Sequence, residues 1–473
     1  MQVRSLQRFL PLTSIALVAV ALFAATNARA EAEDKRFGQE IIEILRDEGK
    51  IDEERYEELR KLEEAEHEAA QAAASTEPDP EDYTVKYKNG LNFNRNDGQV
   101  KIKLGGRIQA DFATIHPDGD LRKSIDNSDG SQIGGDGEGV EFRRTRLYVS
   151  GDLYDRIVFK SQFDFAGGDV SLKDQYIGMK NLPYVGTVLV GHMKEPFSLE
   201  QLTSSKYITF MERSLPSILD SERNFGLLFK NHYLDKRMTA SAGIFAVTGS
   251  DGEFFSRDRD FNVSGRITGL PFYDKEDNQL VHLGFSVIKR FADDGDSGFQ
   301  LRPEIHQAQR YLNTGPFQSD GATVIAAEFA TVMGPFSVQA EWKNGWIDNR
   351  DGNNWEASSV YGEVSYFLTG ESRAYKNSSG TFGRVTPNHP FNPAVGDWGA
   401  WQVAARYSWI DLQDSGMNGG EEQNITAALN WYLYSNVRLQ FNYVFADVSD
   451  TGDILSNSSG HIHAFQSRVQ VEF

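Results

Sequence analysis

The sequence predicts an all-β protein: a transmembrane antiparallel β-barrel of about sixteen strands, preceded by a short N-terminal helical segment. Three observations predict it. Most segments after residue 83 alternate apolar and polar side chains, and the last one ends on an aromatic residue. Short and long connections alternate along the chain. A two-residue alternation places apolar and polar side chains on opposite faces of a strand. An outer-membrane barrel needs this arrangement, because lipid covers its outer face while water fills its interior.

Residues 1–30 predict an export signal that is removed from the mature protein. Arg4 and Arg8 supply a basic start, residues 10–25 are apolar, and residues 28–30 form a small-x-small cleavage site. A membrane-spanning helix is the competing interpretation, but Pro11 interrupts a run that is already short. No later stretch approaches the roughly 18 uninterrupted apolar residues of a spanning helix, so a membrane crossing has to use strands.

Residues 31–82 form an acidic segment with helical periodicity. The segment holds 20 of the 68 acidic residues and 7 of the 48 basic ones, so the net charge of −20 says little about charge inside a barrel. Apolar residues recur three and four positions apart in residues 37–46 and again after Asp52, which is placed to cap a second helix. One narrow apolar stripe cannot bury itself, so a short coiled coil and a partly ordered acidic stalk both stay open. Residues 75–82 have the composition of a linker.

Residues 83–473 are predicted to form the barrel. Alternating segments begin near residues 99, 139, 156, 171, 186, 223, 237, 259, 279, 321, 335, 355, 398, 421, 436 and 461, an even number as in bacterial single-chain barrels. Short connections such as Asp152–Asp155 and Ser435–Asn436 alternate with long ones such as Thr114–Gly139 and Phe291–Gly321, which separates the two ends of a barrel. Thr369–Asp397 departs from this rule, because it is long where a short turn is expected.

The alternation also assigns the faces of the strands. The last strand has Phe465, Val469, Val471 and Phe473 on its outer face and Gln466, Arg468, Gln470 and Glu472 on its inner face. Residues 424–433 and 437–445 divide in the same way. Trp431 and Tyr434, beside a short turn, suit the aromatic girdle of a membrane interface.

Basic residues gather on the predicted inner face of the first three strands. They are Lys101, Lys103 and Arg107 on the first strand, Arg144 and Arg146 on the second, and Lys160 on the third. Arg143 would lie at the outer rim unless its strand bulges. Guanidinium groups donate paired hydrogen bonds to oxyanions, and a ring of them in a narrow neck forms an anion filter. Alternatively, each cation pairs with a nearby acid and merely solvates the wall. Adjacent guanidiniums repel unless an anion lies between them, so the Arg143–Arg144 pair favours the filter.

The connection Lys194–Glu222 is too apolar for a solvated hairpin. We expect it to fold inward and pack against the interior wall, which would bring Lys206, Glu212 and Arg213 to the neck. Contact with a second copy of the chain is the alternative interpretation.

At these residues the chain resembles the phosphate-selective porin O and P family. The matching pieces are KLGGRIQADF (103–112), EFRRTRLYV (141–149), SLEQLTSSKYITFMERSL (198–215), VHLG (281–284), FLTGESRAYK (367–376) and GAWQVAARYSWIDL (399–412). The resemblance covers residues 100–473, and its TSSKYITFMER piece is the most specific. It implies a sixteen-stranded homotrimeric porin whose third loop folds inward and binds anions. It further implies anion contacts at Arg143, Arg144, Asp174 and Arg213.

Three classes of function follow. The first is an outer-membrane channel for passive diffusion of small inorganic anions, with phosphate or polyphosphate as candidates, and with loop 194–222 and the inner arginines as its filter. The second is a general porin with weak or no ionic preference. The third is a barrel enzyme or a structural tether, which the sequence disfavours. The nine histidines show no serine partner for nucleophilic catalysis, and no cysteine, metal-ligand spacing or nucleotide motif points to a cofactor or to nucleic acid.

Overall fold

The computed structural model describes residues 43, 45–47, 49–62, 79–118, 121–124, 136–249, 260–292, 296–350, 352–414, 416–451 and 458–473. The predicted export signal and much of the predicted acidic segment lie outside these residues. Residues 53–62 are helical. Asp52 caps this helix as expected, because its carboxylate accepts a hydrogen bond from the Arg55 backbone N–H at 2.9 Å. Within the described ranges, no helix is long and apolar enough to cross a bilayer.

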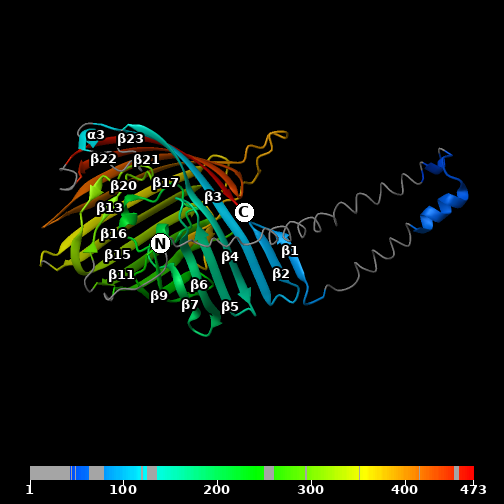
Figure 1. Ribbon diagram of the computed structural model, residues 1–473, viewed down its shortest axis with the longest axis horizontal. Helices are drawn as coiled ribbons and strands as arrows, with labels where there is room; N and C mark the ends of the chain where they lie inside the picture. The colour runs from blue at the N-terminus through cyan, green and yellow to red at the C-terminus, as the bar shows by residue number, and fades with distance from the viewer. Residues whose placement is uncertain are drawn as a thin grey trace, which may run out of the picture. The chain divides into compact units, whose positions relative to one another are not determined.

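Sixteen antiparallel strands form a closed barrel (Figure 1). They are β3 (Val100–Pro117), β4 (Gly137–Leu153), β5 (Ile157–Asp164), β6 (Ser171–Leu182), β7 (Gly186–Lys194), β8 (Arg223–Tyr233), β9 (Met238–Ala246), β10 (Phe261–Asp274), β11 (Gln279–Phe291), β15 (Phe317–Met333), β16 (Phe336–Asn349), β17 (Trp355–Phe367), β20 (Ala400–Asp414), β21 (Met417–Tyr434), β22 (Val437–Asp450) and β23 (Gly460–Glu472). Each strand pairs with the next, and β23 pairs with β3 to close the cylinder. The prediction of sixteen strands is confirmed, with every start within four residues of its expected position.

The remaining elements are short. They are β1 (Tyr83–Tyr87), β2 (Leu91–Arg95), α3 (Leu121–Ser124), α4 (Leu199–Leu202), the 3-10 helix η1 (Leu215–Leu219), β12 (Asp296–Ser297), β13 (Gln300–Leu301), β14 (Leu312–Asn313), β18 (Tyr375–Lys376) and β19 (Thr381–Phe382).

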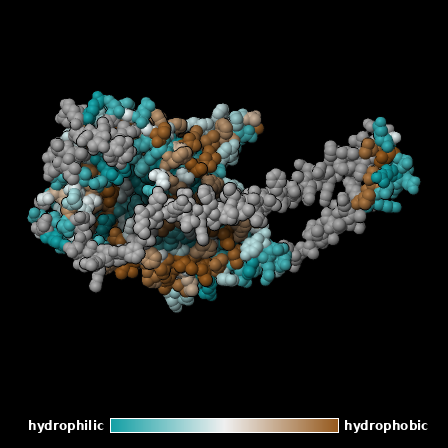
Figure 2. Space-filling model, in the orientation of Figure 1, coloured by the Kyte–Doolittle hydropathy of each residue, from teal (hydrophilic) through white to brown (hydrophobic). Residues whose placement is uncertain are grey.

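The two faces of the barrel wall differ as the alternation predicts. On β23, Val469 is 50% exposed, whereas its neighbour Arg468 is 1% exposed and faces inward. Figure 2 shows hydrophobic residues gathered on the outer side of the barrel. Gly106 in the KLGGR piece has a steric reason. A Cβ at this position would lie 2.6 Å from the Arg146 carbonyl oxygen and 2.6 Å from the ring of Phe473, so a larger residue would displace the backbone or that ring.

The interior is largely filled by connections. The segment 195–222, called the inward loop below, buries Phe197, Leu215 and Leu219 against wall residues such as Ile288 and Trp355. The segment 298–316 buries Tyr311 and places Glu304 between Arg406 and Thr426 of the wall, at 2.5 and 2.7 Å. The described connections leave a cavity along the inner side of β4–β9.

The segment 368–399 resolves the irregular connection noted in the sequence. It leaves the wall at the end where the short turns lie, called the short-turn end, and its hairpin β18–β19 folds inside the barrel. Arg266 of the wall donates to the carbonyl of Gly380 at 2.8 Å, and the Phe382 N–H donates to Thr203 Oγ1 of the inward loop at 3.3 Å. The segment is long because it returns into the interior instead of joining two strands directly.

Candidate functional site

The inward loop crosses the interior and reaches the opposite wall. Backbone carbonyls of Ile208 and Thr209 accept hydrogen bonds from Arg438 and Asn430, at 3.0 and 2.9 Å. Such contacts satisfy carbonyls that a non-regular segment would otherwise bury unpaired. They hold the loop as a fixed partition across the barrel.

The start of the loop is anchored by one carboxylate. Glu341 on β16 accepts hydrogen bonds from the N–H groups of Leu199 and Glu200, at 3.0 and 2.7 Å, and from the Tyr361 hydroxyl at 2.7 Å. Charge-assisted bonds of this kind contribute about 1.5–3 kcal/mol each. Glu341 therefore fixes the start of the inward loop to strand β16.

Glu212 of the loop lies among three guanidiniums. Arg143 binds its two oxygens at 3.0 Å each, Arg468 binds one at 2.7 Å, and Arg144 lies at 3.6 Å. Arg468 also binds both oxygens of Asp111 at 2.6 Å. This group of side chains, called the arginine cluster below, joins the inward loop to the wall by ion pairs.

A β-bulge explains how two consecutive arginines face inward. The pairing of β3 with β4 runs from Gln109–Arg144 to Ala110–Phe142, which leaves Arg143 without an opposite residue. A bulged residue loses the normal alternation of faces. The sequence placed Arg143 at the outer rim unless its strand bulges, and the strand does bulge at this residue.

The electrostatics of the cluster keep Glu212 ionised. Burial by itself would raise the pKa of its carboxyl, but Arg143, Arg144 and Arg468 outweigh burial and hold that pKa well below its usual range. The carboxylate occupies the position in which these guanidiniums would hold a dissolved oxyanion.

The other predicted wall residues take part in three further ion pairs, which involve two carboxylates. Arg146 binds Asp164 at 2.6 Å. Asp174 lies between Lys160 and Arg223 and binds Arg223 at 2.7 Å. Asp174 thus holds two cations at the channel wall.

The two predicted loop cations have different surroundings. Arg213 donates to the carbonyls of Glu200, Gln201 and Thr203 at 3.1–3.2 Å, so it ties the two halves of the loop together. Lys206 binds Glu472 at 3.0 Å, and burial lowers the pKa of its ammonium although Glu472 opposes the shift.

A second basic cluster lies near the short-turn end, around Tyr207. Lys206, Lys376 and Arg384 lie over its ring, with charged groups 5.2, 5.0 and 5.8 Å from the centroid. A cation within about 6 Å of an aromatic face is attracted to it. Glu472 also pairs with Lys206 and Arg384, so its carboxylate and the Tyr207 ring together offset the repulsion among these cations.

The open passage is strongly basic. A cavity of about 1310 Å³ runs along the inner side of β4–β9 and past the inward loop. Among the described residues, fourteen basic ones line it: Lys103, Arg107, Arg143, Arg144, Arg146, Lys160, Lys173, Lys194, Lys206, Arg213, Arg223, Lys230, Arg266 and Lys376. Four acidic residues of the described part of the chain line it: Glu141, Asp164, Asp174 and Glu222. The channel wall carries a large positive excess in a chain whose net charge is −20.

The structure brings all seven predicted site residues to this passage and adds others. The sequence did not single out Lys173, Lys194, Arg223 or Lys230, which line the same channel. The two-residue alternation of β8 would have placed Lys230 inward, but Lys173 and Arg223 stand at strand ends where alternation is no guide. Lys101, predicted on the inner face, lies at the short-turn end beside Asp155 at 3.4 Å.

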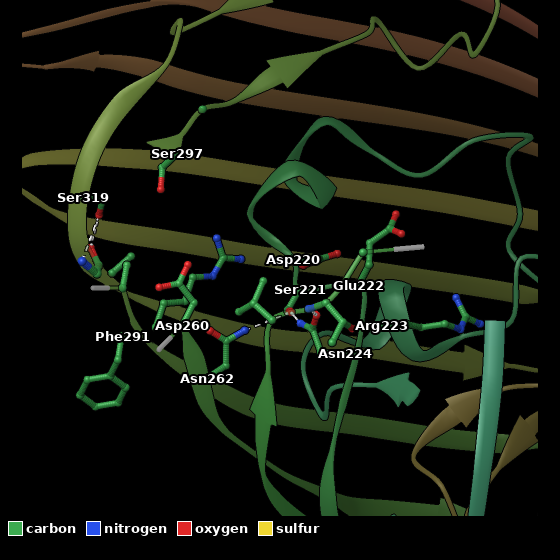
Figure 3. A pocket seen from close by; sticks show the side chains of 18 of the residues that line it. Asp220, Ser221, Glu222, Arg223, Asn224, Asp260, Asn262, Phe291, Ser297 and Ser319 are labelled. Atoms are coloured by element: carbon green, nitrogen blue, oxygen red, sulfur yellow. Dashed lines mark hydrogen bonds between the residues drawn. The ribbon is translucent and has the colours of Figure 1, made fainter. Parts of the chain in front are cut away.

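A smaller cavity of about 490 Å³ adjoins this passage at the end of the barrel opposite the short-turn end. It lies between the end of the inward loop and the wall (Figure 3). It is called the side chamber below. Lys173, Glu222 and Arg223 line both cavities, so the two are adjacent.

Comparison with known proteins identifies relatives. The model of the family "Phosphate-selective porin O and P" matches residues 102–473. A Pseudomonas aeruginosa protein named Porin O is 27% identical over 446 residues, 86% of this chain and 96% of that protein. An uncharacterised Caulobacter vibrioides protein is 27% identical over 403 residues, 82% of this chain and 77% of that protein.

Solved structures of barrel proteins are also similar. The trimer form of OmpT from Vibrio cholerae matches with a TM-score of 0.48 and 9% identity, over 79% of this chain and 99% of that one. An anion-selective porin from Comamonas acidovorans matches with a TM-score of 0.47 and 12% identity, over 79% of this chain and 100% of that one.

Proposed function

This chain belongs to the phosphate-selective porin O and P family and is a channel protein of the Gram-negative outer membrane, and we propose that its channel passes small inorganic anions in preference to cations. One observation carries the proposal: in the part of the chain that the structure describes, fourteen basic residues and four acidic ones line the passage. A wall of one sign concentrates ions of the opposite sign and excludes its own.

The arginine cluster is the proposed filter. Three guanidiniums share the Glu212 carboxylate, so the cluster keeps a positive charge after that pairing. A passing oxyanion would meet the same donors that Glu212 now uses, and the paired N–H groups of arginine suit its oxygens. The Glu212 carboxylate prevents the anion from binding too tightly to leave.

The remaining residues have supporting roles in this proposal. Arg146 and Lys160 continue the basic wall beside the cluster, and Asp174 holds Lys160 in place. Lys206 extends the wall toward the short-turn end. Arg213 keeps the loop closed through its three carbonyl contacts, so that the neck stays narrow.

Phosphate and polyphosphate are the proposed preferred anions, and a homotrimer is the proposed assembly. The named Porin O relative and the family description support the first of these. We further propose that residues 1–30 are removed on export and that the acidic segment 31–82 lies in the periplasm, where it can associate with a second copy.

The test is the reversal potential of single channels in a planar bilayer under a KCl gradient, together with block of chloride current by orthophosphate. We expect anion selectivity and phosphate block. A general porin without ionic preference is the second candidate, because many wall cations are already paired with acids, as Arg146 is with Asp164. Cation selectivity without phosphate block would refute the anion channel, and a reversal potential near zero would support the general porin.

A further inference from the structure

The side chamber has the size and shape of a site for an organic ligand. Its volume of about 490 Å³ lies within the range of about 300–1000 Å³ that is typical of such sites. The loop end, the strand ends of β6–β11 and β15, and the segment near Phe299 surround it. An inorganic anion would leave most of this volume empty.

The charges of the chamber differ from those of the channel. Among the residues that the structure describes, three basic ones, Lys173, Arg223 and Arg290, line the chamber together with three acidic ones, Asp220, Glu222 and Asp260. This balance does not favour an anion held by charge alone. Mixed donors and acceptors instead suit a solute with many hydroxyl groups, since a hydroxyl both donates and accepts.

Several polar groups in the chamber have unused hydrogen-bonding capacity. Asn262, 2% exposed, donates to Glu195 at 2.7 Å, while its Oδ1 has no hydrogen-bond partner in the described part of the chain. Thr248 Oγ1 also has no hydrogen-bond partner among the described residues. Arg290 donates to the Leu219 carbonyl at 3.3 Å and, among the residues described, has no carboxylate in ion-pairing distance. Buried polar groups of this kind normally have a partner, so a ligand or water belongs here.

One side of the chamber is aromatic. Phe299 and Phe317 lie 6.2 Å apart between ring centroids, and both pack edge-on against Trp355. Phe291 does not contribute its ring, which points away from the chamber in Figure 3 and stacks on Phe261 at 4.5 Å. The C–H face of a sugar or polyol could pack against Phe299 and Phe317.

We propose that the channel also admits hydroxylated organic phosphates, such as sugar or polyol monophosphates, and that the side chamber binds their neutral body. The phosphate group would remain in the channel at Lys173 and Arg223, the two cations that line both cavities. The inference rests on the proposed anion function, because the phosphate is drawn in by the basic wall. The chamber adds preference among phosphates.

The test compares three solutes as blockers of chloride current through single channels: orthophosphate, glucose 6-phosphate and glucose. In the unmodified protein, glucose 6-phosphate should block at about tenfold lower concentration than orthophosphate, and glucose should block weakly. Thr248→Val, which removes an unpaired hydroxyl without changing shape, should weaken the block by the ester about threefold, the value of one neutral hydrogen bond. Arg290→Met should remove most of the advantage of the ester. Both variants should leave the orthophosphate block unchanged.

Asn424→Leu is the matched control, because Asn424 is a buried inward-facing asparagine that lines neither cavity. It should alter neither block. Equal block by ester and orthophosphate, or an advantage that survives both chamber variants, would overturn the proposal. Glucose blocking as well as its phosphate would also overturn it. Absence of any orthophosphate block would instead count against the proposed anion function, so the two failures are distinguishable.

Discussion

Replacing Glu212 by glutamine should make the channel more selective for anions. The change keeps the shape of the side chain and removes the one carboxylate that Arg143, Arg144 and Arg468 share. The neck therefore gains about one positive charge. An ion at about 6 Å from that charge gains or loses about 0.7 kcal/mol in water-like surroundings. Anions should become about threefold more abundant in the neck and cations about threefold less, so the permeability ratio should rise about tenfold.

The assay is the reversal potential under a KCl gradient at low ionic strength, where screening is weakest. The single-channel conductance in the same recordings reports whether the inward loop still narrows the barrel. Asp348→Asn is the matched control, since Asp348 pairs with Lys289 at 3.1 Å and forms no ion pair with the arginine cluster among the residues described. A permeability ratio that stays constant or falls in Glu212→Gln, with normal conductance, would refute the assignment of the arginine cluster as the filter.

Three further predictions follow from the contacts described. Arg213→Ala frees three loop carbonyls, so conductance should rise and fluctuate while the sign of selectivity is kept; an unchanged, quiet channel would contradict the role of Arg213 in closing the loop. Replacing residues 375–382 by a short glycine–serine turn removes the inner hairpin and the basic residue Lys376, so conductance should increase with a modest loss of anion preference; equal conductance would show that the hairpin does not narrow the passage. The guanidiniums depress the pKa of Glu212, so its charge and its contribution to stability persist above its unfolded pKa and are lost only as pH falls through the lower folded value. In a background that replaces the passage-lining His232 and His306 by asparagine, reversal potentials should therefore stay constant between about pH 7 and 5, and a steep change across that interval would contradict the depressed pKa.

The sequence predicted the barrel well because each strand carries its own alternation. In β21, Asn424 and Thr426 face inward and Ile425 faces outward, as the pattern requires, and no distant contact is needed to assign them. The inward loop was also predictable, since a long apolar connection cannot lie in water. The path of 368–399 was not, because its direction depends on contacts with Arg266 and Thr203, which are far away in the chain.

The ion-pair partners of the site residues could not be predicted from the sequence, because they too are distant in the chain. Arg143, Arg144 and Arg146 were identified from one strand, but their carboxylates come from the loop and from β5. Arg213 shows the limit clearly: its place in the loop was expected, whereas its bonds to three backbone carbonyls depend on how the loop turns back on itself.

The pairing of β23 with β3 sets a condition on assembly. The Gly106 N–H donates to the carbonyl of Phe473 at 2.6 Å, and Phe473 donates back to Gly106 at 3.2 Å, so the first and last strands complete each other. Until residues 460–473 leave the export machinery, β3 keeps an unsatisfied edge, and such edges invite aggregation. The barrel can close only once residues 460–473 are available to pair with β3, so the last segment of the chain decides when that open edge is covered.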